Sequence, residues 1–256
     1  MVGPESDPLG SGAVTVPDVS GGDSERFWDE RARENALYFV DTGVGYQDPD
    51  TDAFWRRGQD VVQRMLDLAD VAIRECDAIV DIGCGVGRLT RALAARAGHV
   101  YGLDVSREML ALARRHNADL CNVEWLHGDG HGLQALGDAT VDGCFSHVVF
   151  QHIPEPEVTL DYVRDMGRVL RDGGWALFQV STDPGVHRVR EGLRVRMQRL
   201  VGAESRVRHD RAWWGSAVEV GALHAAVEQG GLELKQLHGA GSQYTTVFAR
   251  RAQRVR

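Results

Sequence analysis

Between Val80 and Thr90 the sequence VDIGCGVGRLT places glycines at three alternate positions just after an aspartate. Glycine is used where a backbone turns sharply or must come very close to a ligand. The stretch lies between an apolar run and a helix-like run, and open parallel sheets bind ligands at such turns. We therefore interpret it as a ligand-binding turn, formed by Asp81, Gly83, Gly85 and Gly87.

The glycine spacing argues against a dinucleotide site. Such a site uses G-x-G-x-x-G, in which the third glycine falls three residues after the second. Arg88 stands at that position in this sequence. A dehydrogenase is therefore the least favoured enzyme class.

A second carboxylate follows at a suitable distance. Asp104 ends the next apolar run, 21 residues after Gly83. An acid at this position can accept hydrogen bonds from both ribose hydroxyls of a bound nucleoside. The alternative is that Asp104 only caps the helix that follows it.

The order Asp81-Ile-Gly83-Cys-Gly85-Val-Gly87 resembles the first motif of class I S-adenosylmethionine-dependent methyltransferases. FSHVVFQHIP (145–154) and VLRDGGWALF (169–178) are similar to later motifs of the small-molecule branch, so the resemblance covers about residues 78–181. It implies S-adenosylmethionine as cofactor and S-adenosylhomocysteine as product, with Val105, Met109 and Asp129 near the adenine and Cys84 as a small filler. The full set of implied cofactor residues is Asp81, Gly83, Cys84, Gly85, Gly87, Asp104, Val105, Met109, Asp129, Gly130 and Ser146.

The fourth-strand motif narrows the acceptor class. Relatives that methylate DNA bases or glutamine carry an Asn/Asp-Pro-Pro-Tyr/Phe stretch there, whereas this chain has SHVVF at 146–150. We therefore expect a small-molecule acceptor and no nucleic acid. The net charge of −8 agrees, because it does not provide a general phosphate-binding surface.

Methyl transfer to a hydroxyl requires that its proton be removed, since an alcohol is a poor nucleophile at neutral pH. His152 is our first candidate base, because imidazole titrates in the right range, and His147 is the second. The alternative is that the His-Ile-Pro run at 152–154 only begins the next helix. We predict no metal site, with a divalent ion such as magnesium kept as an alternative activator.

The acceptor pocket is expected from segments outside the shared motifs. Trp28, Tyr38, Trp213 and Trp214 are the predicted acceptor contacts, with Phe39 beside them. Arg31 and Tyr38 are further placed near the methionine end of the cofactor. The alternatives are that the tryptophan pair packs its segment onto the sheet and that the arginines at 188–211 form a solvated face.

We predict transfer of a methyl group to a hydroxyl oxygen of a small molecule, such as a sugar or a specialised metabolite. N-methylation of a small amine ranks second and a carbon acceptor ranks third. Outside catalysis, a cofactor-binding regulatory protein remains the alternative.

The elements that must position these residues alternate between strands and helices. Apolar runs predict strands over 78–82, 99–105, 123–129, 141–150, 175–181, 232–239 and 242–251, the last two paired antiparallel. Amphipathic runs predict helices over 26–40, 53–76, 88–97, 107–117, 156–174 and 217–231. The alternation predicts an α/β fold, a Rossmann-like three-layer sandwich with seven strands, mostly parallel with an antiparallel last strand.

We expect one methyltransferase domain over 25–256, preceded by a disordered tail over 1–24 that is rich in Gly, Pro, Ser and Asp. Within the domain, 25–77 is the expected helical lid and 183–215 the expected cap over the acceptor. The four cysteines form no CxxC pair, and no secretory signal or membrane span is recognised. We therefore expect a cytoplasmic monomer or homodimer.

Overall fold

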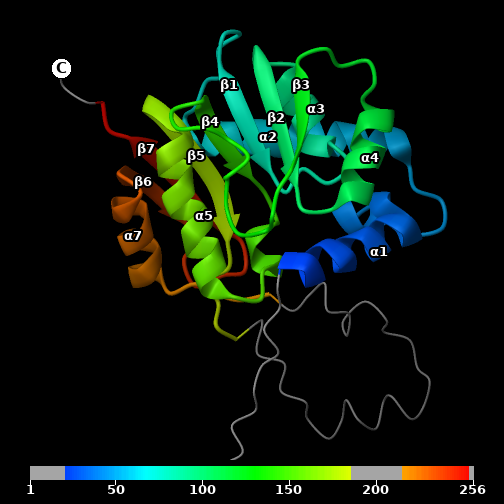
Figure 1. The fold of residues 1–256 in the computed structure, drawn as a ribbon. Helices are drawn as coiled ribbons and strands as arrows, with labels where there is room; N and C mark the ends of the chain where they lie inside the picture. Colours follow the sequence, from blue (N-terminus) through cyan, green and yellow to red (C-terminus); the bar gives the residue numbers. More distant parts are fainter. Residues whose placement is uncertain (1–20, 186–214, 254–256) are drawn as a thin grey trace, which may run out of the picture.

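A computed structural model of the chain describes residues 21–185 and 215–253. The strands of this part form one sheet in the order β3-β2-β1-β4-β5-β7-β6 (Figure 1). The first five strands run parallel, and β7 runs antiparallel to both of its neighbours, which confirms the predicted fold class. The strands are β1 (Ala78–Ile82), β2 (His99–Asp104), β3 (Val123–His127), β4 (Val141–Ser146), β5 (Leu170–Val180), β6 (Leu232–His238) and β7 (Thr245–Arg251).

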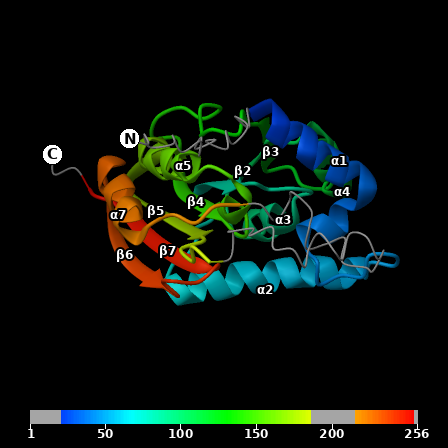
Figure 2. The same cartoon turned by 90° about the horizontal axis from the view of Figure 1, so that it is seen from below.

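Helices cover both faces of this sheet. In Figure 2, α2 runs along one side of the molecule and α5 lies on the other. Side chains alternate along β1, so Ile79 packs with α2 and α3, whereas Val80 and Ile82 pack with α5 and α7. The helices are α1 (Gly21–Val40), α2 (Thr51–Ala69), α3 (Arg88–Ala94), α4 (Arg107–His116), the 3-10 turn η1 (Phe150–His152), α5 (Pro156–Val169) and α7 (Val220–Gln229).

Helix α2 ends earlier than its sequence suggests. We predicted it to reach residue 76, but Asp70 adopts a left-handed conformation and the N–H of Val71 bonds back to Leu66 O at 3.0 Å. This arrangement closes the helix end. In the last turn of this helix Leu66 and Ala69 are buried, whereas Leu68 is exposed.

Strand β4 is also shorter than predicted. It stops at Ser146, and the predicted strand residues 147–149 form a loop before η1. Val148 has a φ of 58°, which takes the chain out of the sheet. The expected strand to residue 150 was wrong, and His147 consequently lies in this loop at the end of the sheet. On the other side of α5, β5 begins at Leu170 rather than at Trp175, because Leu170 already pairs with Val141.

Helix α1 begins at Gly21, inside the stretch that we expected to be a tail. It is interrupted at Asn35, whose backbone is not helical. It lies against α4, as Figure 1 shows.

The predicted cap over 183–215 falls mostly outside the described residues, as do Trp213 and Trp214. None of the described helices combines the length and apolar character that crossing a membrane requires.

Candidate functional site

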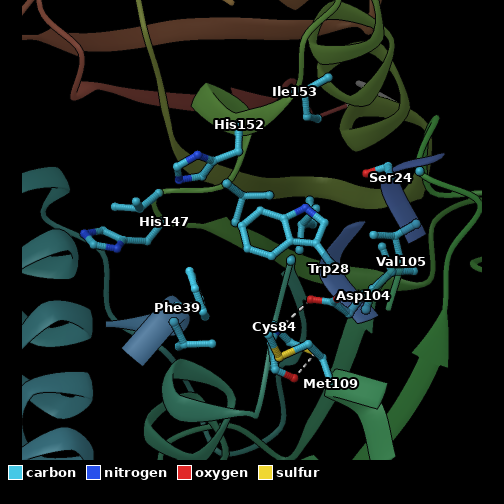
Figure 3. Close-up of a pocket in the computed structure, with 18 of the residues that line it drawn as sticks. Ser24, Trp28, Phe39, Cys84, Asp104, Val105, Met109, His147, His152 and Ile153 are labelled. Atoms are coloured by element: carbon cyan, nitrogen blue, oxygen red, sulfur yellow. Dashed lines mark hydrogen bonds between the residues drawn. The ribbon is translucent and has the colours of Figure 1, made fainter. Parts of the chain in front are cut away.

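A cavity of about 330 Å³ opens at the carboxyl ends of β1, β2 and β4. This is where the strand order reverses direction, the usual ligand position in an open α/β sheet. Helix α1 and the residues that follow it form the opposite side of the cavity. Figure 3 shows Asp104, Val105 and Met109 on one side, with His147 and His152 across from them.

The glycine turn forms the floor of this cavity. Gly83 and Gly85 both have positive φ angles, of 73° and 55°. The N–H groups of Gly83 and Cys84 donate to Leu103 O at 2.8 and 3.0 Å, which ties the turn to the end of β2. A Cβ atom on Gly83 would lie 2.5 Å from Val149, so only glycine keeps this surface open.

Asp104 is fixed at the end of β2 by backbone donors. The N–H of Gly85 donates to its Oδ2 and the N–H of Ser106 to its Oδ1, both at 2.8 Å. Burial raises the pKa of this carboxyl, and the backbone hydrogen bonds counteract that rise. A carboxylate has about four acceptor positions. Asp104 therefore keeps acceptor capacity toward the cavity, and Val105 and Met109 line the wall beside it.

Asp81 lies deeper in the same floor. It is 1% exposed, and the hydroxyl of Thr90 donates to its Oδ2 at 2.6 Å. Burial raises the pKa of Asp81 to about 7. The group is therefore close to half protonated at neutral pH. Burial also raises the pKa of the neighbouring Cys84 thiol, so that thiol stays protonated.

Three of the predicted cofactor residues are not among those that line the cavity. A Cβ atom on Gly87 would meet Trp125 at 2.5 Å, so this glycine allows α3 and β3 to pack closely. Ser146 is fully buried, and its hydroxyl donates to Ile82 O at 3.0 Å. Asp129 is exposed, and its Oδ1 accepts from the N–H of His131 at 2.8 Å. Gly130, next to Asp129, does line the cavity.

The two candidate histidines both line the cavity. Burial, together with the charges of Arg88 and Arg64, lowers the pKa of His147 to about 4, and its Nδ1 is buried without a hydrogen-bond partner. His152 makes an edge-to-face contact with Trp28, with ring centroids 5.7 Å apart. The fold thus brings together residues from η1 and α1 that are far apart in the sequence.

The aromatic residues predicted from α1 line the cavity, whereas Arg31 does not. Trp28, Tyr38 and Phe39 line the cavity. Tyr38 and Phe39 pack edge to face at 5.5 Å. The guanidinium of Arg31 lies 5.3 Å from the Phe39 ring centre and forms a salt bridge with Glu34, and Arg31 is not among the lining residues.

Sequence reasoning missed a charged part of the cavity wall. Arg88, which we used only to reject a dinucleotide motif, lines the cavity together with Asp41. Tyr162 from α5 also lines it. Asp41 carried no motif or periodic signal, because it lies in the loop after α1. Within the described ranges, His, Cys, Asp and Glu side chains form no group of three that could hold a metal ion.

Comparison with known proteins adds independent information. Residues 79–174 match the family model described as a methyltransferase domain. The chain is 35% identical over 144 residues to trans-aconitate 2-methyltransferase of an Azoarcus species, covering 54% of this chain and 53% of that protein. It is 32% identical over 129 residues to N-demethylindolmycin N-methyltransferase of Streptomyces griseus, covering 50% and 53%. The chain spans between about a third and two thirds of the length of the curated relatives it matches.

The fold is shared with solved methyltransferases. The structure of geranyl diphosphate methyltransferase in complex with GPP and sinefungin superposes with a TM-score of 0.60 and 16% identity, covering 91% of this chain and 98% of that one. The matched domain includes the glycine turn, Asp104 and both candidate histidines. Residues 79–174 thus match a methyltransferase domain, and the chain shares its fold with solved methyltransferases.

Proposed function

We propose that this protein transfers a methyl group from S-adenosylmethionine to a hydroxyl oxygen of a small molecule. One observation carries the proposal: a single cavity has the glycine turn and Asp104 on one side and two histidines on the other. Such an arrangement supports a cofactor surface and a proton acceptor that share the same space. The acceptor's further identity, as a sugar or a specialised metabolite, stays a prediction.

The cofactor surface fits a nucleoside attached to an amino acid. When bound, S-adenosylmethionine supplies a methyl group on a positively charged sulfur, which is an excellent leaving group. Asp104 would accept hydrogen bonds from the ribose hydroxyls, because backbone donors fix its carboxylate at the cavity. Val105 and Met109 would offer apolar contacts to the adenine. Gly83 and Gly85 would let the methionine chain lie against the backbone, since neither carries a side chain there.

The two histidines on the opposite side of the cavity support different roles. A general base works best when its pKa lies near the working pH. The low pKa of His147 makes it a weak base that stays neutral at physiological pH. Its buried Nδ1 has no protein partner and would accept a hydrogen bond from the acceptor molecule. We therefore assign removal of the hydroxyl proton to His152, which Trp28 contacts at the cavity.

N-methylation is the second candidate. It is supported by the 32% identity to N-demethylindolmycin N-methyltransferase. An unprotonated amine already carries a lone pair and needs less help from a base. The low pKa of His147 suits such an acceptor as well, because a neutral imidazole does not repel an amine that carries partial positive charge.

The proposal is tested by a methyl-transfer screen with labelled S-adenosylmethionine against phenols, sugars and amines. On the best acceptor, we expect His152→Ala to lower kcat about 100-fold for a hydroxyl, the usual loss when a general base is removed. Binding of S-adenosylhomocysteine, measured by calorimetry, is expected to stay unchanged.

His224→Ala is the matched control, because His224 is exposed on α7 and is not among the residues that line the cavity. Unchanged turnover of His152→Ala on a hydroxyl acceptor would remove His152 as the base. Transfer to amines alone would replace the proposal by its second candidate. No transfer to any acceptor class would leave the non-catalytic, cofactor-binding alternative.

A further inference from the structure

Arg88 is a buried cation that faces the cavity with unused hydrogen-bond donors. It is 6% exposed and begins α3, directly after the glycine turn. Its Nη1 donates to Asp41 Oδ2 at 3.1 Å, whereas its Nε is buried and has no partner. Its guanidinium lies 5.6 Å from the centre of the Phe54 ring. A guanidinium has five N–H donors in a fork that matches a carboxylate. Arg88 therefore retains capacity for one more acidic partner.

Within residues 21–185 and 215–253, the positive charge around Arg88 is only partly balanced by carboxylates. Asp41 also accepts from Arg57, with 2.9 Å from Arg57 Nε to Oδ2 and 3.0 Å from Nη2 to Oδ1. Two guanidiniums thus share one carboxylate. Asp81 contributes only part of a negative charge at neutral pH, because its pKa is about 7. Buried charges are normally paired, so this corner of the cavity favours an anion.

The rest of this corner belongs to the acceptor side of the cavity. His147 lies close enough to Arg88 for the Arg88 charge to contribute to its lowered pKa, after the larger effect of burial. Phe39 and Trp28 provide aromatic surfaces nearby, and Figure 3 shows Phe39 below His147. Asp104, Val105 and Met109 occupy the other side. A ligand that contacts both the aromatic surfaces and the Arg88 guanidinium would have a flat apolar body and an acidic group.

We propose that the methyl acceptor carries a carboxylate, which binds the guanidinium of Arg88 beside Asp41. This inference rests on the proposed function and deepens it by naming a substrate class. Arg88 is then a specificity-determining residue. Its hydrogen bond to Asp41 holds the guanidinium in the position that binds the carboxylate. Asp41 keeps Arg57 as a partner when Arg88 is replaced, so a substitution at Arg88 does not strand a buried carboxylate.

The test measures binding and needs no turnover. Protein saturated with S-adenosylhomocysteine is titrated by calorimetry with three acid and amide pairs: cinnamate and cinnamamide, 4-hydroxybenzoate and 4-hydroxybenzamide, and indole-3-acetate and indole-3-acetamide. We expect the acid of at least one pair to bind about 10-fold more tightly, since an arginine–carboxylate pair is a charge-assisted contact. Arg88→Met is expected to remove this preference, and Arg88→Lys to keep part of it.

The controls separate this site from the cofactor site. Arg56→Met removes an exposed cation of α2 and is expected to keep the acid preference. The affinity of Arg88→Met for S-adenosylhomocysteine, which carries the methionine carboxylate, is expected to change less than 3-fold.

The inference is overturned if no pair shows acid preference in the unmodified protein, or if Arg88→Met keeps it. It is also overturned if Arg88→Met weakens S-adenosylhomocysteine binding tenfold, because Arg88 would then serve the cofactor. If Arg88→Met does not fold, the uncharged variant Arg88→Gln takes its place and is judged by the same criteria. Failure of methyl transfer in the labelled screen would instead contradict the proposed function, so the two failures are distinguishable.

Discussion

The two sides of the cavity are built in different ways. The floor and cofactor side come from one stretch of chain, from Asp81 to Met109, of which Arg88 reaches the acceptor side. Strand pairing and backbone hydrogen bonds at the turn hold this stretch. The opposite side comes from α1, from the loop at Asp41 and from the segment at 147–154. Side-chain contacts join these pieces, among them the edge-to-face contact of Trp28 with His152.

This difference indicates which side of the cavity tolerates amino-acid substitutions. A turn that is held by its own backbone and by left-handed glycines has few sequences that can form it. A wall assembled from side chains of distant segments can change its shape by substitution without disturbing the sheet. We therefore expect substitutions on the cofactor side to have large effects on cofactor binding, and those in α1 to have small effects.

The largest effect is expected for Asp104→Ala. Hydrogen bonds to a charged acceptor contribute about 1.5–3 kcal/mol each, so the loss of those to the ribose should weaken S-adenosylmethionine binding roughly 100-fold. Calorimetry measures this affinity. Asp129→Ala is the control and should change it less than about 3-fold, because Asp129 is exposed and bonds within its own turn. Equal losses in the two variants would place Asp129 in the cofactor site.

An intermediate effect is expected at Asp81 in the cavity floor. It concerns how the free energy of unfolding depends on pH. The raised pKa of Asp81 means that the folded protein holds its proton more tightly than the unfolded chain does. Its contribution to stability is therefore largest below the unfolded pKa near 4 and is lost as the pH rises through about 7.

Compared with Asp81→Asn, the unmodified protein should lose about 2–3 kcal/mol of unfolding free energy between pH 5 and pH 8. Urea denaturation at the two pH values measures this difference. Asparagine does not titrate, so groups common to both proteins cancel in the comparison. Parallel pH profiles for the two proteins would show that Asp81 keeps an ordinary pKa.

The smallest effect is expected where α1 is attached. Asp29 Oδ1 accepts from Ser106 Oγ at 2.6 Å and from the N–H of Glu108 at 3.1 Å, which joins α1 to the start of α4. Asp29→Ala should lower the unfolding free energy by about 1 kcal/mol and speed S-adenosylhomocysteine dissociation about 5-fold. Denaturation and stopped-flow measurements check this.

Glu30→Ala is the control for α1, because Glu30 forms an exposed pair with Arg26 and should leave both quantities nearly unchanged. If Asp29→Ala weakened cofactor binding as much as Asp104→Ala, the contrast between the two sides of the cavity would be wrong.

Much of the fold could be predicted because its strands are apolar and its turns are marked by glycine. The predicted limits of β1 match the structure, and β2 and α4 end within one residue of their predicted ends. The end of β4 could not be predicted, because Val148-Val149-Phe150 is typical of a strand in composition. Tertiary packing turns this segment away from the sheet through Val148, a β-branched residue with a positive φ.

In the candidate site, too, some residues could be predicted from the sequence and others could not. Gly83, Gly85, Asp104, Val105 and Met109 were found in the sequence, because a turn and the two strands that flank it are local features. Gly87 and Ser146 belong to the same motifs but serve packing and strand attachment instead. Spacing alone does not distinguish these roles, because the glycines of one turn have different surroundings: a Cβ atom on Gly83 would meet Val149, whereas one on Gly87 would meet Trp125.

By itself the sequence determined the fold class, the order of strands and helices along the chain, and the local surface at the glycine turn that we propose for the cofactor. Only the tertiary structure decided what faces that surface. It brought Trp28 against His152 and joined Arg88 to Asp41 across 47 positions of the chain. It also buried His147 so that its pKa falls. Burial and charge pairing depend on which distant segments pack together, and no local pattern of residues records that choice.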